Sequence, residues 1–260
     1  MHKPVALITG ASTGIGYEMA KIFAARGYDL VVVARSAKNL KALQNSLSPL
    51  VKVTSIPLDL TSPKAAQSLF SKTQKAKLEI DVLVNNAGFG SSGKFVDLDL
   101  KRELMQIDLN VRVLTELTHL YGAEMSKRKK GRILNVASTA AFQPGPFMAV
   151  YYATKAFVLH FSEAIADELK PRGVQVSVLC PGATVTEFAD TAGMHKSRLF
   201  SSKLMKPATA EAVAIYGVNK FLKGKTLIIH GFMNKVMVIS GKFSPRFVVR
   251  KIAGYLNGAG

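Results

Sequence analysis

The stretch TGASTGIG, residues 9–16, directly follows the apolar run VALIT of residues 5–9. Glycines at positions 10, 14 and 16 permit a tight turn and let phosphate oxygens approach backbone N–H groups closely. A helix is expected to begin at about Ile15, and its N-terminus adds a partial positive charge at the same place. A glycine-rich loop between a strand and a helix therefore predicts a site for the phosphates of a dinucleotide.

Outward from this loop, short apolar runs alternate with amphipathic segments along the whole chain. Helices are expected over about 15–26, 37–47, 101–125 and 150–169, and a further one is expected behind Thr61-Ser62-Pro63, with Pro63 at its first position. Strands are expected at residues 5–9, 29–35, 53–59, 82–88, 132–138, 174–182 and 226–231. Continuous apolar strands separated by helices are typical of a parallel sheet covered on both faces. We therefore expect one α/β domain over residues 1–260, with a doubly wound parallel sheet of about seven strands.

Composition narrows the class of protein further. Of the 260 residues, 48% are hydrophobic and 20% are charged, which excludes global disorder. The single cysteine, Cys180, excludes an internal disulfide and is expected as a small buried residue, and the five histidines lack metal-ligand spacing. No apolar run approaches the length of a membrane-spanning helix, and the N-terminus does not resemble a signal peptide. We expect a cytoplasmic protein without a metal.

The formal net charge of +18 is concentrated near the C-terminus. Residues 191–260 contain twelve Lys or Arg and one acid, Glu211, whereas the first 190 residues carry a net charge of only +7. This excess could serve solubility, or it could attract an anionic substrate, an acidic protein or a lipid surface.

Five motifs in register resemble one known family. They are TGASTGIG at 9–16, NNAG at 85–88, Ser138, the run YYATK at 151–155 and PGATVT at 181–186. In order and spacing, over roughly residues 3–190, they resemble the short-chain dehydrogenase/reductase family. The resemblance implies a Rossmann-type domain that binds a nicotinamide dinucleotide and interconverts a carbonyl compound and an alcohol.

The reduction of a carbonyl needs a proton donor, and a tyrosine with an ordinary pKa near 10 exchanges protons poorly at neutral pH. Tyr151 and Lys155 are four residues apart on an expected helix, so they share a face, and a nearby ammonium lowers a tyrosine pKa. The resemblance assigns Tyr151 as the proton donor and Lys155 as the residue that lowers its pKa and bonds the nicotinamide ribose. It implies that Ser138 polarises the carbonyl and that Asn110 holds a water, although Asn110 could equally be a polar residue on a helix surface.

The resemblance also implies a set of cofactor contacts. The phosphate loop supplies Gly10, Ser12, Thr13, Gly14, Ile15 and Gly16; Asp59 and Leu60 flank the adenine; Asn86, Ala87 and Gly88 line the adenosine ribose; Tyr151 and Lys155 face the nicotinamide ribose; and Pro181, Gly182, Thr184, Val185 and Thr186 contact the carboxamide. Alternatively, Asp59 could have only a structural role, marking the N-terminus of the next helix.

Arg35 decides the expected form of the cofactor. It ends the second strand, where NAD-binding proteins of this fold place an acid, and no acid is nearby. A guanidinium can bind a 2′-phosphate through two charge-assisted hydrogen bonds, and the Ser36 hydroxyl can add a third. We therefore predict NADPH/NADP⁺, the alternative being that Arg35 is a solvated surface charge.

Residues of about 187–210 correspond to the substrate lid of the family. Apolar side chains there lie among basic ones, and aromatic loops elsewhere could face the same pocket, although such residues are often ordinary core. The apolar set is Phe89, Phe142, Phe147, Met148, Phe188, Met194, Phe200, Leu204 and Met205, and the basic set is Lys196, Arg198, Lys203 and Lys206. The pattern predicts an apolar pocket with a basic mouth.

The C-terminal segment departs from the family. A basic amphipathic helix is expected at about 243–257, with Val248, Ile252, Tyr255 and Leu256 on one face and Arg246 and Arg250 broadly opposite. It could dock on its own domain, which we favour, or lie on an anionic membrane. The Asp-Gly-Gly ending of ketoacyl reductases is absent, so a homodimer through the helices of Asn110 and Tyr151 is expected, with a tetramer still possible.

The function predicted from these patterns is NADPH-dependent reduction of a hydrophobic small-molecule carbonyl compound. A β-ketoacyl-thioester reductase and a hydroxysteroid-type dehydrogenase are the alternatives within the enzyme class. From another class, a basic membrane- or nucleic-acid-binding protein could retain an inactive scaffold, although no nucleic-acid motif is present.

Overall fold

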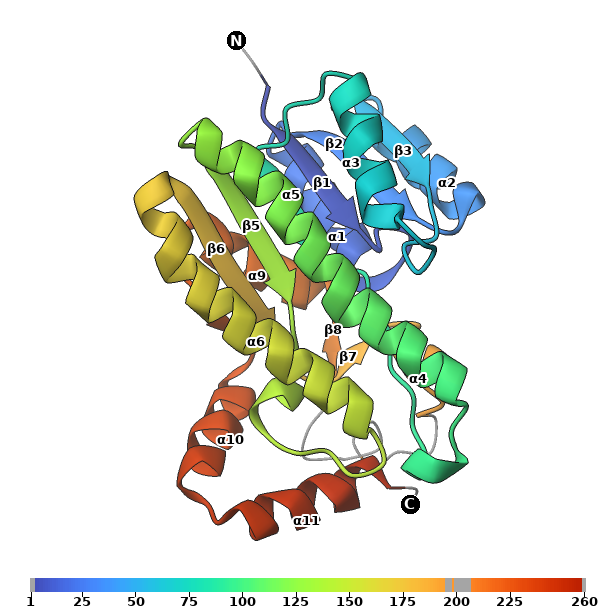
Figure 1. Cartoon of the computed structure of the whole chain (residues 1–260), viewed down its shortest axis with the longest axis vertical. Coiled ribbons are helices and arrows are strands. Elements are labelled where there is room, and N and C mark those ends of the chain that lie inside the picture. The colour runs from blue at the N-terminus through green and yellow to red at the C-terminus, as the bar shows by residue number, and fades with distance from the viewer. Residues whose placement is uncertain (1–2, 195–197, 199–206, 259–260) are drawn as a thin grey trace.

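A computed structural model describes residues 3–194, 198 and 207–258. Its centre is a parallel sheet of seven strands in the order β3-β2-β1-β4-β5-β6-β9 (Figure 1). The strands are β1 (Val5–Thr9), β2 (Asp29–Ala34), β3 (Val53–Pro57), β4 (Val82–Asn85), β5 (Gly131–Val136), β6 (Val174–Cys180) and β9 (Leu227–Ile229). A second, two-stranded sheet pairs β7 (Thr184–Val185) with β8 (Ala208–Thr209). The predicted single Rossmann-type α/β domain is confirmed.

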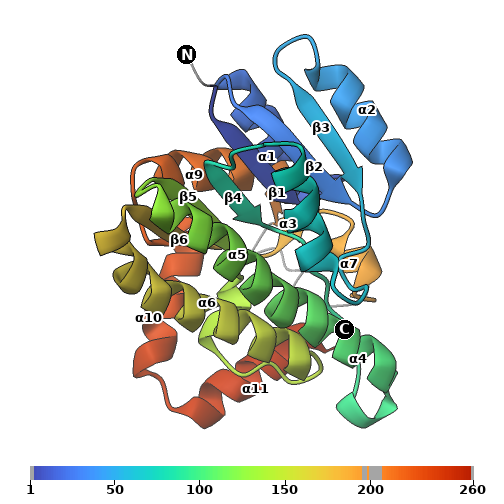
Figure 2. The same ribbon diagram turned by 45° about the horizontal axis from the view of Figure 1, so that its top comes forward.

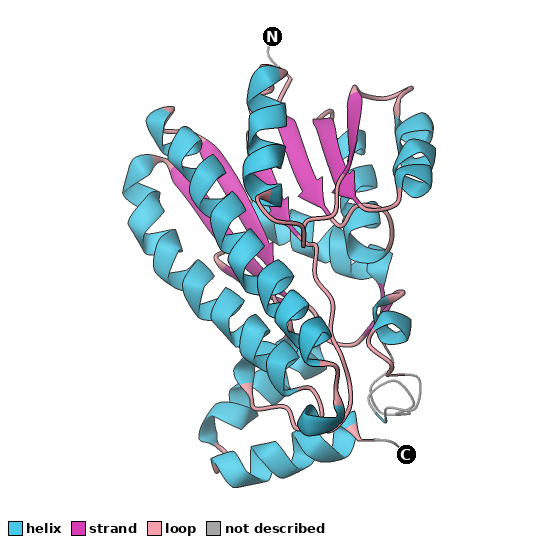
Figure 3. Ribbon diagram, turned by 45° about the vertical axis from the view of Figure 1, so that its right-hand side comes forward, coloured by secondary structure: helices cyan, strands magenta, loops and turns pink. Residues whose placement is uncertain are grey.

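Alternation along the strands produces two hydrophobic layers, because successive side chains point to opposite faces. On one face, Ala6 and Ile8 pack with α1 (Gly14–Ala25), α2 (Ala37–Leu47) and α9 (Ala210–Leu222). On the other, Val5 and Leu7 pack with α3 (Ala65–Lys75), α5 (Leu114–Lys127) and α6 (Ala149–Leu169). Figure 3 shows the sheet enclosed between these helices.

The chain reverses its direction of winding between β1 and β4. The strand β1 pairs with β2 on one side and with β4 on the other, both in parallel. In open parallel sheets, ligands bind outside the carboxyl ends of the strands at such a switch point. The loops that follow β1 and β4 carry two of the sequence motifs, TGASTGIG and NNAG.

Two predicted helices differ in detail from the structure. The segment 101–125, expected as one helix, is helical throughout, but α4 (Leu100–Ile107) continues through a π-helical turn over Asp108–Val113 into α5. The helix α3 starts at Ala65 rather than at Pro63, because Lys64 adopts a left-handed conformation with φ 57°.

The C-terminal part of the chain forms two helices where one was expected. These are α10 (Phe232–Phe243), which was not predicted, and α11 (Arg246–Asn257). The buried residues of α11 are Val249, Ala253 and Asn257, so the predicted apolar face is only partly right: Tyr255 is exposed, whereas Ile252 and Leu256 border a cavity. Figures 1 and 2 show α10 and α11 at the end of the molecule opposite the N-terminus, next to α6.

The remaining elements are short. They are 3-10 turns at Phe95–Asp97, Thr139–Phe142 and Lys170–Arg172, and the helix α7 (Phe188–Thr191). None of the helices in the described part of the chain is long and apolar enough to cross a membrane.

Candidate active site

A cavity of about 1100 Å³ opens at the carboxyl ends of the sheet strands. Nineteen of the residues predicted from the sequence line it: Gly10, Ser12, Thr13, Gly14, Ile15, Arg35, Ser36, Asp59, Leu60, Asn86, Ala87, Gly88, Ser138, Tyr151, Lys155, Pro181, Gly182, Thr184 and Thr186. Three predicted residues, Gly16, Asn110 and Val185, are not part of this lining. The side chain of Val185 is 63% exposed, so its expected contact with a cofactor stays a prediction.

Close packing explains two of the loop glycines. A Cβ on Gly16 would lie 2.4 Å from the carbonyl oxygen of Gly10, so any side chain there would separate α1 from the turn. Gly14 has φ +60°, and a Cβ there would come within 3.1 Å of Thr186 Cγ2. The turn after β1 therefore leaves its backbone open toward the cavity, and Thr186 lies directly across from it.

Thr9 and Asn86 hold the two motif loops together, and sequence reasoning missed the role of Thr9. Its Oγ1 accepts hydrogen bonds from the backbone N–H groups of Asn86 and Ala87, at 3.0 Å each. The Asn86 side-chain amide donates to the carbonyl oxygens of Thr9 and Gly10, at 3.0 and 3.1 Å. These bonds fix the spacing between the ends of β1 and β4.

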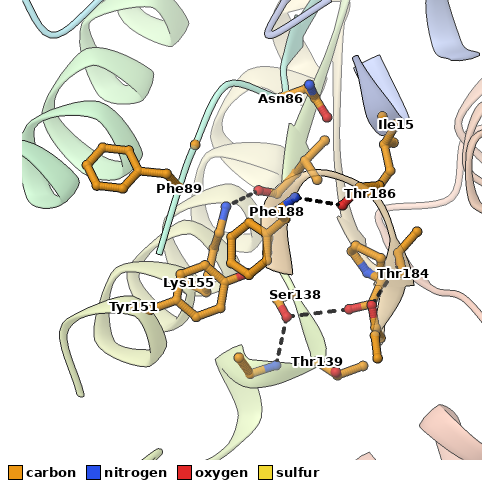
Figure 4. Close-up of a pocket in the computed structure, with 18 of the residues that line it drawn as sticks. Ile15, Asn86, Phe89, Ser138, Thr139, Tyr151, Lys155, Thr184, Thr186 and Phe188 are labelled. Carbon is orange, nitrogen blue, oxygen red and sulfur yellow. Dashed lines mark hydrogen bonds between the residues drawn. The ribbon is translucent and has the colours of Figure 1, made fainter. Parts of the chain in front are cut away.

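Ser138 and Tyr151 meet on one wall of the cavity (Figure 4). Ser138 Oγ accepts from the N–H of Ala140 at 3.1 Å and donates to the carbonyl oxygen of Pro181 at 3.4 Å. Tyr151, in the first turn of α6, lines the same cavity. The ring of Tyr151 packs on Phe188, with 5.1 Å between centroids.

Lys155 is buried one helical turn beyond Tyr151. Its Nζ donates to the carbonyl oxygen of Val136 at 2.9 Å and lies 5.8 Å from the centroid of the Tyr151 ring. Burial lowers the pKa of Lys155 to about 8.

The expected lowering of the tyrosine pKa by Lys155 stays a prediction. Burial raises the pKa of Tyr151 above its ordinary value of 10, and the neighbouring Ser138 hydroxyl only partly opposes this. The physical reason is that the apolar wall disfavours tyrosinate, while the ammonium group is directed at a backbone carbonyl.

Asn110 lies in the π-helical turn and is 1% exposed, so it is not a surface residue. Its Nδ2 donates to the carbonyl oxygen of Phe89 at 3.0 Å and to Thr154 Oγ1 at 3.1 Å, and its Oδ1 accepts from the N–H of Phe89 at 3.2 Å. A Cβ on Gly88 would lie 2.8 Å from Asn110 Oδ1 and 3.4 Å from Lys155 Nζ. Asn110 therefore fixes the loop after β4 beside Lys155; its role in holding a water stays a prediction.

At the other end of the cavity, the polar residues have structural partners as well. Asp59 Oδ1 accepts hydrogen bonds from the N–H and the hydroxyl of Thr61, at 2.9 and 2.8 Å. The residue therefore lines the cavity and also stabilises the turn that precedes α3. Ser36 Oγ caps α2 by accepting from the N–H of Asn39 at 3.2 Å. Arg35 is exposed at the cavity edge and takes part in none of the ion pairs recorded among the described residues.

The wall nearest Tyr151 is apolar and comes from several elements. Its members include Phe89, Phe142, Met148, Phe188, Met194, Phe232, Met233, Met237, Val238, Val249, Ile252 and Leu256. The contributions from α10 and α11 were not predicted, because nothing in the sequence pattern shows that these helices fold back over the sheet ends. Arg102 was missed too: its guanidinium lies 5.1 Å from the ring centroid of Phe89 in the same lining.

Some residues predicted for the substrate pocket do not line the cavity, and others lie outside the described residues. Phe147 has φ +66°, is 39% exposed and is not in the lining. Of the lid residues, Lys196, Phe200, Lys203, Leu204, Met205 and Lys206 lie outside the described residues. Cys180 is buried, as expected.

The fold and this site together define a class. Residues 4–197 match the family model for short chain dehydrogenase, and the chain belongs to this family. It is an oxidoreductase acting on a CH–OH/C=O pair with a nicotinamide cofactor.

Named relatives are similar over nearly the whole chain. The chain is 33% identical over 253 residues to the ketoacyl reductase HetN of a Nostoc species, covering 94% of this chain and 86% of the relative. A short-chain dehydrogenase from Sphingobium yanoikuyae, solved in complex with NADPH, is 32% identical with a TM-score of 0.82, covering 92% and 93% of the two chains. The bulky-bulky ketone specific alcohol dehydrogenase from Comamonas testosteroni is 30% identical with a TM-score of 0.78, covering 94% and 93%.

The described residues fit a nicotinamide dinucleotide. The glycine turn exposes its backbone to the cavity, and the cation Arg35 follows β2. Gly88, which has no side chain, leaves space in front of Lys155. Both ends of an elongated, anionic cofactor therefore have suitable neighbours in one continuous cavity.

Proposed function

We propose that this protein is an NADPH-dependent carbonyl reductase for bulky apolar substrates. One observation carries the proposal. A single cavity joins the glycine turn and Arg35 at one end to Ser138, Tyr151 and a wall of apolar side chains at the other. A cofactor and an apolar carbonyl compound can thus meet beside the hydroxyl groups that the reaction needs.

The chain's own residues supply the proton and hold the substrate. When bound, the nicotinamide provides a hydride for the carbonyl carbon. The Ser138 hydroxyl turns from Pro181 to donate to the substrate oxygen, as a preplaced donor should. Tyr151, whose burial raises its pKa, is protonated at neutral pH, and it gives its proton to the developing alkoxide once a nearby positive charge offsets the effect of burial. The nearby ammonium of Lys155 stabilises the tyrosinate that remains.

Arg35 supports the choice of NADPH over NADH. It is exposed at the cavity edge, directly after β2, and the residues flanking it, Ala34 and Ser36, carry no charge. A carboxylate there would repel a 2′-phosphate, whereas a guanidinium binds it. The related Sphingobium enzyme was solved with NADPH.

The first substrate class is a bulky apolar ketone, which suits the Phe and Met side chains of the wall. A 3-oxoacyl thioester is the second candidate, favoured by the similarity to a ketoacyl reductase and by Arg102 in the lining. The first class needs only apolar contacts, while the second adds an anionic carrier that a basic surface attracts.

The test is NADPH consumption, followed by absorbance, over small ketones, bulky ketones, a steroid and 3-oxoacyl thioesters. We expect turnover of the bulky substrates, a loss of at least about a hundredfold in Tyr151→Phe, and a shift of preference from NADPH toward NADH in Arg35→Asp. Lys38→Asp is the matched control, since this exposed lysine on α2 is outside the lining. No turnover with any substrate, or turnover that Tyr151→Phe retains, contradicts the proposal.

A basic binding protein on an inactive scaffold predicts another result in the same measurements. Salt-sensitive binding of anionic polymers would then survive in Tyr151→Phe, and NADPH would not bind. NADPH turnover that Tyr151→Phe abolishes excludes that alternative.

A further inference from the structure

The helix α10 is apolar on two opposite sides. Its inner side, which includes Val238 and Met237, packs on the domain and reaches the cavity. On the outer side, Phe232, Val236, Ile239 and Phe243 follow one another at intervals of four, three and four residues. At about 100° per residue, this spacing places all four on one stripe, away from the buried Val238; Phe232, at the start of the stripe, also borders the cavity.

This outer stripe is exposed. Phe243 is 87% exposed, Phe232 78%, Ile239 57% and Val236 41%. Phe247 on α11, immediately after the turn between the two helices, is also exposed. Isolated exposed apolar residues need no explanation, but a continuous row of them on one helix marks an interaction surface. We call these five residues the outer face.

The charge around the outer face has one sign. Residues 212–258 contain eight lysines or arginines and no acid. Lys235 and Lys242 fall side by side along one flank of the α10 stripe, seven residues apart, and Lys251 lies next to Phe247 on the exposed side of α11. An aromatic and aliphatic stripe flanked by lysines is complementary to a lipid surface with anionic headgroups, since the apolar atoms reach the acyl boundary while the cations meet the phosphates.

We infer that the outer face of α10 and α11 docks on an anionic lipid surface. The protein lies on the membrane without spanning it, in agreement with the absence of a membrane-spanning helix among the described residues. The end of the molecule that carries α10 and α11 then faces the lipid (Figures 1 and 2).

The same two helices form part of the cavity wall. Met233 and Met237 on α10, and Val249 and Leu256 on α11, line the cavity from the inner side. Docking therefore places the cavity one helix thickness from the lipid, where a lipophilic compound partitions. The docking itself does not depend on the proposed function, because it needs neither a cofactor nor turnover.

The experiment is flotation of the whole protein with vesicles of phosphatidylcholine alone and of phosphatidylcholine mixed with phosphatidylglycerol. We expect binding to the mixed vesicles that weakens as salt rises, and little binding to phosphatidylcholine. The double variant Phe232→Ser/Phe243→Ser should weaken binding by at least about tenfold, since two large apolar side chains leave the lipid. Lys235→Glu/Lys242→Glu should weaken it as well.

The matched control is Leu50→Ser/Val96→Ser, which removes two exposed apolar side chains far along the chain from α10 and should leave vesicle binding unchanged. Circular dichroism establishes that every variant is folded, as expected for exposed positions. The inference is overturned by absence of binding to mixed vesicles at low salt, or by binding that both double variants of α10 retain. It is also overturned if Phe232→Ser/Phe243→Ser lowers the molar mass in solution, because a second copy of the chain then covers the outer face.

Discussion

At the scale of single residues, the most unusual group is the buried cation Lys155. The Val136 carbonyl holds it at 2.9 Å, and burial lowers its pKa from the ordinary 10.5 to about 8. The unfolded chain therefore binds this proton more tightly than the folded chain does. Below pH 8 both states are protonated and the folded state bears the full desolvation penalty; between pH 8 and 10.5 the free energy of unfolding rises with pH.

Lys155→Met should consequently increase stability while removing activity. The variant loses one hydrogen bond but no longer buries a charge, so we expect its free energy of unfolding at pH 7 to exceed that of the wild type by about 1 kcal/mol. The difference should shrink as the pH approaches 10.5. Urea denaturation at both pH values measures it, with the exposed Lys223→Met as control. A variant less stable than the wild type at pH 7 would contradict this account.

At the scale of elements, the packing of α11 against the start of α6 decides the shape of the substrate end. The hydroxyl of Tyr152 donates to Asn257 Oδ1 at 3.0 Å, and Asn257 Nδ2 donates to the carbonyl oxygen of Pro146 at 3.0 Å. Gly254 packs on Pro146 in the same contact. The residue next to Tyr151 thus anchors the helix that brings Val249 and Leu256 into the cavity wall.

Asn257→Ala should loosen this wall without touching the reacting groups. It leaves the Tyr152 hydroxyl and the Pro146 carbonyl without these partners, which is expected to lower the free energy of unfolding by about 1–3 kcal/mol. We expect KM for bulky ketones to rise severalfold while kcat for a small ketone changes little. Tyr152→Phe, which removes only one of the two bonds, should have a smaller effect in the same direction. Unchanged KM values in Asn257→Ala would show that α11 does not shape the substrate end.

At the scale of the whole molecule, a second apolar surface lies apart from the outer face of α10. Leu100, Leu104 and Ile107 are exposed at intervals of four and three residues on α4, and Phe157 is exposed on α6. The helices α4 and α6 pack against each other, so their apolar residues can form one surface. A symmetric pairing of two copies would bury it.

This surface supports the predicted homodimer through the helices of Asn110 and Tyr151. We expect a dimer in light scattering after size exclusion, and a monomer in Leu104→Arg/Phe157→Arg, since two buried and unpaired cations would oppose association. Leu50→Arg, at an exposed position outside both surfaces, should leave the mass unchanged. A monomeric wild-type protein would refute the prediction.

The sequence by itself determined the alternation of strands and helices as far as β6, the glycine turn and the residue types at the site. These features depend on local rules: strand runs are apolar because both faces of the sheet are covered, and a turn without room for a Cβ requires glycine. The register of Tyr151 and Lys155 follows from the helical period alone. The expected strands over 226–231 and 29–35 agree with β9 and β2 to within a few residues for the same reason.

Only the tertiary structure decided how these residues act on one another. The π-helical turn at Asn110, the bond from Lys155 to Val136 and the raised pKa of Tyr151 arise from segments far apart in the sequence. The fold-back of α10 and α11 likewise depends on the partner of Asn257, which lies 105 residues away at Tyr152. Periodicity reports which side of a helix is apolar, but α10 is apolar on two sides, and only packing shows which of them is buried and which remains exposed.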